Sequence, residues 1–236
     1  MTKYMQIAND IRNNIVKGIL KPNDQLPFEK DLCEKYDASK MTVKKALDIL
    51  VTQGLIVKRR GSGTFVKSIS NADMNKLVIS NQFRGLTALY SNQKVSSEVL
   101  TFEVVPSSEI VRNKLQLENE DFVYNILRVR YVDGAPTVME HMYMPIALIP
   151  GLKRKNATES IYSYIEGDLG YKIQSSHRAI SVRKSNELEQ SKLKLEVNDP
   201  VAVVEQVAYL ENGVAFEYSI SVHRYDNFLF ETVIVI

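Results

Sequence analysis

Apolar residues recur at helical spacing near the start of the chain. Ile7, Ile11 and Ile15 lie four residues apart and therefore share one side of a helix. Further apolar stripes cover residues 29–36 and residues 40–53, and a glycine follows the first and the third stripe. This pattern predicts three helices before residue 54.

The residues that follow have the pattern of a short β-hairpin. Residues 55–59 and 64–67 are rich in apolar and β-branched side chains, and the tip between them carries two glycines. Ser39 is a good N-cap for the third helix, which leaves only a tight turn after the second helix. Three helices with a tight turn before the last one, followed by a hairpin, form a winged helix-turn-helix, which is a DNA-binding fold.

Polar side chains occupy the positions that such a fold presents to DNA. If the apolar side of the third helix is buried, Lys40, Thr42 and Lys44 project from its first turn, the part that reaches base edges in the major groove. Lysine can donate to guanine, and threonine can offer its methyl group to thymine. Arg59 and Arg60 precede the glycine tip, where the backbone can approach phosphates. The alternative is a solvated helix face beside a charged hairpin.

Residues 25–67 resemble the N-terminal domain of the GntR family of bacterial regulators. The matching motifs are Leu26-Pro27, Leu32, Ser39-x-Met41-Thr42-Val43, Ala46-Leu47, Gly54-Leu55 and Gly61-Ser62-Gly63-Thr64-Phe65-Val66. The resemblance implies that Lys30 contacts phosphate, that Lys40, Thr42 and Lys44 contact bases or their phosphates, and that Gly63 lies at the minor groove. The three lysines stand where the family usually has arginine, so we expect softer sequence discrimination. Phe28 replaces the usual capping serine of the second helix.

The charge distribution supports a basic DNA-binding part. Residues 1–67 carry 13 Lys and Arg against 7 Asp and Glu, whereas the rest of the chain carries 17 against 21. A basic first part joined to an acidic remainder is expected when only the first part meets a polyanion. Chance clustering is the alternative, and the charge alone does not decide between the two.

A second domain is predicted after a polar linker. Residues 68–75 are polar and have no apolar period, although a surface loop within one domain has the same composition. Strand-like and helix-like segments then alternate, which predicts an α+β fold around an antiparallel sheet. The predicted strands cover residues 122–132 and 201–210, and the predicted helices cover residues 106–115, 158–169 and 185–193. The predicted organisation is a DNA-binding domain at 1–67, a linker at 68–75 and a second domain at 76–236.

Charged residues on one predicted strand suggest a binding site. Arg128 and Arg130 are two residues apart, so both point to the face that also holds Tyr124. Two cations on an apolar face need an anionic partner, because an unpaired buried charge is very costly. Glu140 faces Arg128 only if the connecting turn has three residues or a bulge. The alternative is a structural Arg–Glu pair on an exposed face of the sheet.

Two hydroxyl groups extend the same argument. Ser160 and Tyr162 fall in the first turn of the predicted helix over 158–169, where free backbone N–H groups and the helix dipole favour an anion. Each has an ordinary alternative role, Ser160 as a helix cap and Tyr162 as a core aromatic. Together with the two arginines, they predict a small anionic ligand.

Residues 77–236 resemble the UTRA effector domain of the HutC branch of GntR regulators, whose fold is similar to chorismate lyase. The matching motifs are Arg128-Val-Arg130, Asp133-Gly-x-Pro136, Glu140, Tyr143-Met-Pro145, Pro150-Gly-Leu152, Ser160-Ile-Tyr162 and Gly213 through Glu217 to Arg224. By this resemblance the phosphate contacts are Arg128, Arg130, Ser160 and Tyr162, and the sugar-hydroxyl contacts are Glu140 and Glu217. Thr87 is a further candidate, because the segment near it closes on the ligand in many relatives. His223 is a candidate pocket residue, with an ordinary strand position as the alternative.

The sequence argues against several other classes of protein. Its apolar runs are too short to span a bilayer and its first residues lack the apolar stretch of a signal peptide, so we expect a cytoplasmic protein. Cys33 is the single cysteine, and the three histidines have no metal-ligand spacing, so we expect no metal and no other cofactor. No nucleophile motif surrounds any serine, so we expect no catalytic residues.

The combined expectation is a repressor of transcription that binds operator DNA as a homodimer and responds to a small anionic metabolite. The resemblance favours a sugar phosphate, although other members of the branch bind urocanate or fatty acids. Two alternatives stay open. One is a lyase-like enzymatic activity in the effector domain, because fold does not determine function. The other is a constitutive DNA binder without a ligand.

Overall fold

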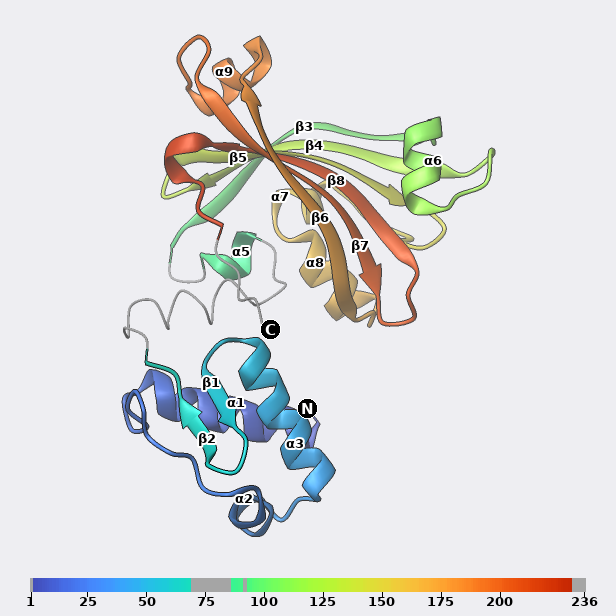
Figure 1. Cartoon of the computed structure of the whole chain (residues 1–236). Coiled ribbons are helices and arrows are strands. Elements are labelled where there is room, and N and C mark those ends of the chain that lie inside the picture. The colour runs from blue at the N-terminus through green and yellow to red at the C-terminus, as the bar shows by residue number, and fades with distance from the viewer. Residues whose placement is uncertain (1, 69–85, 91–92, 231–236) are drawn as a thin grey trace. The chain divides into compact units, whose positions relative to one another are not determined.

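The computed structural model describes residues 2–68, 86–90 and 93–230 (Figure 1). The chain divides into two compact units, one containing residues 2–68 and the other containing residues 86–90 and 93–229. Residues 69–75 of the predicted linker at 68–75 lie outside the described residues. Gly85, two residues before the candidate contact Thr87, lies outside them as well. Each unit is described by itself below.

The first unit contains three helices and a two-stranded antiparallel hairpin. Its elements are α1 (Lys3–Val16), α2 (Glu29–Tyr36), α3 (Lys40–Thr52), β1 (Ile56–Arg59) and β2 (Gly63–Val66). A bridge between Gln25 and Phe65 attaches the segment before α2 to the hairpin. The order and the pairing confirm the predicted winged helix-turn-helix.

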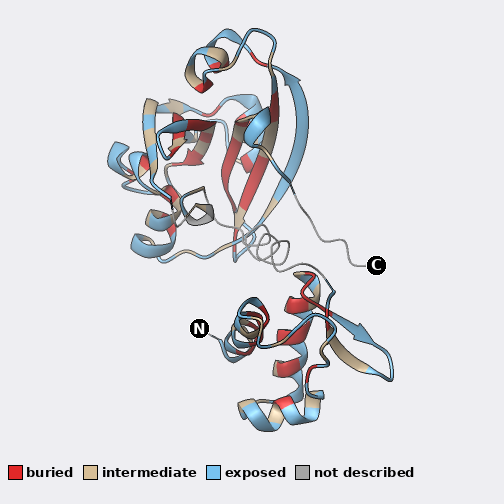
Figure 2. Ribbon diagram, turned by 90° about the vertical axis from the view of Figure 1, so that its left-hand side faces the viewer, coloured by how far each residue is buried: buried red, intermediate tan, exposed pale blue. Residues whose placement is uncertain are grey.

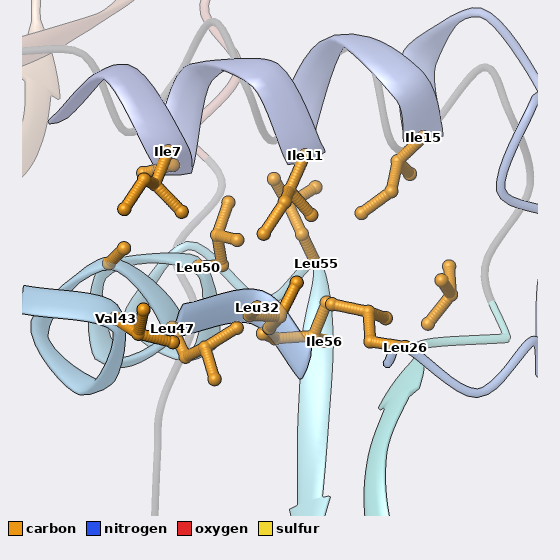
Figure 3. Close-up of a cluster of buried hydrophobic side chains, with 13 residues drawn as sticks. Ile7, Ile11, Ile15, Leu26, Leu32, Val43, Leu47, Leu50, Leu55 and Ile56 are labelled. Carbon is orange, nitrogen blue, oxygen red and sulfur yellow. The ribbon is translucent and has the colours of Figure 1, made fainter. Parts of the chain in front are cut away.

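The core of the first unit follows from the apolar stripes. Figure 3 shows Ile7, Ile11 and Ile15 pointing from α1 toward the side chains of α3 and β1. The Ser39 hydroxyl caps α3 by accepting a hydrogen bond from the Thr42 N–H at 3.2 Å. The start of α2 at Phe28 has no side-chain cap, as the missing serine led us to expect. Figure 2 shows the buried residues on one side of each helix.

The second unit is built on six long strands. Its strands are β3 (Val95–Pro106), β4 (Phe122–Val132), β5 (Ala135–Pro145), β6 (Ile173–Lys184), β7 (Pro200–Leu210) and β8 (Ala215–Arg224). Its helices are α5 (Leu86–Leu89), α6 (Glu109–Leu115), α7 (Arg154–Thr158), α8 (Ile161–Ser163), the π-helix η1 (Tyr164–Asp168), α9 (Glu187–Leu193) and the 3-10 helix η2 (Tyr225–Asn227). The strands form one antiparallel sheet in the order β3-β4-β5-β8-β7-β6.

Helices cover both faces of this sheet (Figure 1). Ile126 of β4 packs with Ile161 of α8 and other residues of the α7–η1 region. Its neighbour on the opposite face, Val129, packs with Leu193 of α9, and α6 packs on that opposite face as well. The sheet is therefore a central layer, and the predicted α+β fold is confirmed.

The structure corrects one expectation about this unit and adds two strands that were not predicted. The predicted helix over 158–169 is not continuous, because α7 ends at Thr158 and Glu159 leaves the helical backbone with a ψ of −102°. Ser160 then caps a new helix by accepting from the Ser163 N–H at 3.2 Å. The edge strands β3 and β6 were not predicted. β6 is exposed along most of its length, so it lacks the alternation of a half-buried strand.

Candidate functional site

The first turn of α3 presents the predicted DNA contacts. Lys40 and Lys44 are exposed. Val43, which lies between them, and Leu47, one turn further along, are buried. Thr42 is half-buried, and its hydroxyl lies 2.9 Å from the hydroxyl of Ser39. The cap therefore holds Thr42 while the two lysines extend into solvent, as a recognition helix requires.

The hairpin adds a second basic surface. Arg59 and Arg60 are exposed, and the guanidinium of Arg59 lies over the Phe65 ring at 4.9 Å. Gly63 has a φ of +120°, which side chains rarely allow, and an added Cβ would lie 2.6 Å from the Gln25 Nε2 atom. Lys30 is exposed on α2. Glycine at position 63 thus lets the hairpin close against Gln25.

In the second unit, Arg128 donates to two acceptors on the face of the sheet that packs against the α7–η1 region. The register places it directly opposite Glu140, because β5 carries an extra residue, Thr137, opposite the step from Arg130 to Tyr131 on β4. Arg128 Nε donates to Glu140 Oε2 at 2.7 Å, and its Nη1 donates to the backbone oxygen of Ala157 at 2.7 Å. The question of register that the sequence left open is therefore resolved in favour of a bulge.

Arg130 is less completely paired than Arg128. It is 2% exposed, and its Nη1 lies 4.0 Å from the same Glu140 oxygen that Arg128 uses. Its Nη2 donates to the Thr87 hydroxyl at 2.6 Å, which brings α5 to the site. Its Nε is buried and has no hydrogen-bond partner among the described residues. Two buried guanidinium groups thus share one carboxylate oxygen.

The pKa shifts reflect this crowding of positive charge. Burial and, second to it, the neighbouring charge of Arg128 lower the pKa of Arg130 to about 10, against the opposing charge of Glu140. Burial by itself raises the pKa of Glu140, but the charges of Arg128 and Arg130 outweigh it, so the net shift is downward. Arg130 and Glu140 therefore stay ionised at neutral pH.

A second buried carboxyl, Glu217, lies on the same face of the sheet. Its Oε1 accepts hydrogen bonds from Ser219 Oγ at 2.8 Å and from Gln206 Nε2 at 3.1 Å. The Tyr162 hydroxyl donates to the same oxygen at 3.3 Å. Arg178 Nε donates to the Gln206 carbonyl oxygen at 2.6 Å, which turns the Gln206 amino group toward Glu217. Glu217 Oε2 is buried and has no partner among the described residues.

The pKa of Glu217 is shifted in the opposite direction from that of Glu140. Burial raises its pKa, and the charge of Glu140 adds to the increase. Tyr162 has a pKa well above its ordinary value, first because it is buried and second because Glu217 is near. The site therefore has a positive side at the arginines and a side of hydroxyl, amide and carboxyl groups at Glu217, whose pKa is shifted upward.

The remaining predicted ligand contacts lie around these two sides. Thr87 is exposed, and Ser160 is half-buried and used as the cap of α8. His223 is half-buried, and its ring lies 4.9 Å from that of Phe228. Burial lowers the pKa of His223 to about 4, although the charge of Glu140 opposes the shift. His223 is therefore neutral at pH 7 and is within electrostatic range of the site.

Sequence reasoning missed three polar residues of the site: Arg178, Gln206 and Ser219. They belong to β6, β7 and β8 and are neighbours across the sheet, since Arg178 pairs with Gln206 and Gln206 pairs with Ser219. Their alignment depends on strand register, which no local motif encodes. The local signal that a polar residue is unusual there is that Val204 and Ala208, two positions to either side of Gln206, are apolar.

Among the described residues, no group of three His, Cys, Asp or Glu side chains is placed to bind a metal ion. No helix in the described part of the chain has the length and apolar character needed to cross a membrane.

The two units together define a class of protein. A winged helix-turn-helix with a basic first turn reads DNA, and a separate domain carries a buried polar site, so the chain is a DNA-binding transcription regulator. Comparisons with known proteins agree. The description "Bacterial regulatory proteins, gntR family" matches residues 3–66, and the UTRA domain matches residues 91–228.

Individual relatives match along nearly the whole chain. The HTH-type transcriptional regulator GmuR of Bacillus subtilis (strain 168) is 40% identical over 233 residues, which cover 99% of this chain and 98% of GmuR. TreR of the same strain is 31% identical over 232 residues, which cover 98% and 96%. The crystal structure of the possible transcriptional regulator YydK from Bacillus subtilis superposes with a TM-score of 0.82 at 28% identity, covering 97% of this chain and 99% of YydK.

The chain therefore belongs to the GntR family of bacterial transcription regulators, and its second unit is a UTRA domain. The resemblance drawn from the sequence motifs is confirmed.

Proposed function

We propose that the chain is a repressor that binds operator DNA as a homodimer and is controlled by a sugar phosphate in its second unit. The observation that supports a ligand most directly is the pair of buried guanidinium groups that share Glu140. Removing charge from water is costly, and one carboxylate leaves the cluster of Arg128, Arg130 and Glu140 with one excess positive charge. A bound anion supplies the missing negative charge.

The proposed ligand has hydroxyl groups as well as an anionic group. Arginine presents planar N–H donors that suit phosphate oxygens, and Arg130 Nε is available for this contact. Glu217 Oε2 is available to a hydroxyl on the other side of the site. TreR, one of the relatives, has a solved domain described as the effector-binding domain of a trehalose repressor, and it superposes on this chain with a TM-score of 0.53 at 28% identity. Sugar chemistry is therefore a sensible first choice for the ligand.

Ser160, Tyr162, Thr87 and His223 complete the proposed ligand contacts. In the first unit the proposed DNA contacts are Lys30, Lys40, Thr42, Lys44, Arg59, Arg60 and Gly63. A homodimer would place two such surfaces on the half-sites of a palindrome. Ligand control requires a coupling of only about 1–3 kcal/mol, which changes operator affinity roughly 5–150-fold.

A thermal-shift screen of the full chain tests the ligand. We expect phosphorylated sugars to raise the unfolding temperature and the matching unphosphorylated sugars to have little effect. Stabilisation by the unphosphorylated sugars alone would contradict the anion site. Absence of any stabilisation would favour a constitutive DNA binder.

The same compounds separate a sensor from an enzyme. Incubation with the protein should return the compound unchanged, and product formation would identify a lyase-like activity instead. A gel-shift titration with operator DNA should show release by the stabilising compound. Arg130→Gln should lose this release and keep operator affinity, whereas Lys155→Gln, on the exposed surface of α7, should behave as wild type.

A further inference from the structure

Unpaired polar atoms are concentrated on one face of the sheet of the second unit. Across the residues that the structure describes, four buried side-chain polar atoms have no hydrogen-bond partner, and they belong to Ser97, Ser107, Arg130 and Glu217. Native structures leave few such atoms, because each one costs free energy. Three of the four lie on the face that carries the arginine pair, and one of these, Ser97, has no assigned role.

Ser97 lies directly beside Arg130. The antiparallel register of β3 and β4 pairs the two residues, so their side chains emerge on the same face. Side chains in such opposed positions have Cβ atoms roughly 4.5–5.5 Å apart. Ser97 Oγ and Arg130 Nε are both buried, both can donate a hydrogen bond, and neither has a partner among the residues that the structure describes.

The rest of the Arg130 side chain is held in place. Thr87 accepts from Nη2, and Nη1 is the atom nearest to Glu140. The Nε–H group is therefore a buried donor left for a ligand, whereas Nη1 lies beyond hydrogen-bond distance of Glu140. An oxygen atom that accepts from Nε at the β3 side of Arg130 also comes within reach of the Ser97 hydroxyl.

We propose that Ser97 is a ligand contact, and that its hydroxyl donates to the anionic group bound by Arg130 Nε. The inference rests on the proposed anion site and adds to it an element, the edge strand β3, that was not expected to take part. Packing alone does not account for serine at this position. Alanine would fill the same space without burying an unpaired hydroxyl, which is unfavourable in the free protein.

Strand β3 offers a matched control for a test. Ser96 is the preceding residue, is exposed, and pairs with Tyr131 on the opposite face. The variants Ser97→Ala, Ser97→Thr and Ser96→Ala are made in the full chain. Each is titrated with inorganic phosphate at constant ionic strength, and unfolding temperature is measured with and without phosphate.

We expect Ser97→Ala to weaken phosphate binding about tenfold, the loss typical of one hydrogen bond to a charged group. Ser97→Thr keeps a hydroxyl and should bind within a few-fold of wild type, as should Ser96→Ala. Without phosphate, Ser97→Ala should unfold at the same temperature as wild type or a higher one. This last result separates ligand binding from a structural role.

Two outcomes overturn the proposal while leaving the anion site intact. One is unchanged phosphate affinity in Ser97→Ala, and the other is a lower unfolding temperature without phosphate, which would show that the hydroxyl serves the fold. If wild type itself gains no stability from phosphate, the anion site fails, and the role of Ser97 fails with it.

Discussion

Replacing Glu140 by glutamine tests the charge argument on which the ligand site rests. Glutamine has nearly the same shape as glutamate but no charge, so Glu140→Gln leaves Arg128 and Arg130 without their shared counter-charge. Removing one partner of a buried ion pair costs about 3–5 kcal/mol. For a protein of this size each kcal/mol lowers the unfolding temperature by roughly 2–4 °C, so we expect a decrease of roughly 6–20 °C.

An exposed ion pair of the same unit provides the control. Lys172 and Glu211 are 3.0 Å apart, but their side chains are 73% and 54% exposed. Surface pairs are worth about 0–1 kcal/mol, so Glu211→Gln should change the unfolding temperature by no more than roughly 4 °C. The comparison separates loss of a buried charge from loss of any charge.

The assay is thermal unfolding of the full chain in sodium chloride, repeated with sulfate or phosphate at the same ionic strength. A divalent anion can occupy the place of the lost carboxylate, so Glu140→Gln should regain more stability than wild type. Equal losses in Glu140→Gln and Glu211→Gln would refute the reasoning, because the cluster would then carry no uncompensated charge. Equal responses of Glu140→Gln and wild type to the anions would do so as well.

The pH dependence gives an independent check. The pKa of Glu140 is lowered in the folded protein, so the stability that it contributes is present above its unfolded pKa and is lost as pH falls through the folded value. Wild type and Glu140→Gln should therefore differ most at neutral pH and converge in acid. A difference that stays constant down to acidic pH would mean that the charge of Glu140 is not its source.

Three further predictions concern other parts of the chain. Lys44→Ala should weaken operator binding at least tenfold in a fluorescence titration at fixed salt, since a base contact is worth ~1–3 kcal/mol. Gly63→Ala should destabilise the hairpin by ~1–3 kcal/mol, because φ is +120° and the new Cβ would lie 2.6 Å from Gln25 Nε2, and calorimetry would measure the loss. His223→Gln should reduce the loss of stability on acidification, because the folded pKa of about 4 makes the unfolded chain bind more protons between pH 6.5 and 4.

Each of these predictions has a matched control in the chain. Lys17→Ala removes an exposed charge at the end of α1 and should leave operator affinity near that of wild type. Gly61→Ala meets a positive φ of +77° but has no atom near its new Cβ, so it should cost less than Gly63→Ala. His177→Gln removes an exposed imidazole and is the control for His223→Gln. Equal effects of variant and control would contradict the corresponding prediction.

Local signals were sufficient to predict the first unit. The cap at Ser39, the stripe of isoleucines in α1 and the glycine at position 63 each act within a few residues, so their order along the chain already specifies the fold. The same local reasoning failed at Glu159. Ile161 and Ile165 have helical spacing, but the change of backbone direction before Ser160 depends on packing against the sheet and not on that spacing.

The ligand site was predictable only in part, because strand register assembles it. The alternation rule placed Arg128 and Arg130 on one face, whereas their pairing with Glu140 required the extra residue, Thr137, on β5. Ser97 could not be found from sequence, since nothing near it marks β3 as the neighbour of β4. Resemblance to a family can transfer a residue that matches a motif, but it cannot reveal a contact made by an edge strand outside the motifs.

Because the two units have separate cores, the DNA-binding and ligand-binding predictions can be tested by separate substitutions. Among the described residues, the core cluster of the first unit ends at Val66, and the core clusters of the second unit begin at Val99. We therefore expect Glu140→Gln to act on the stability of the second unit and Lys44→Ala to act on operator affinity. Ligand control requires a coupling of about 1–3 kcal/mol, which does not exceed the 3–5 kcal/mol expected for the loss of Glu140.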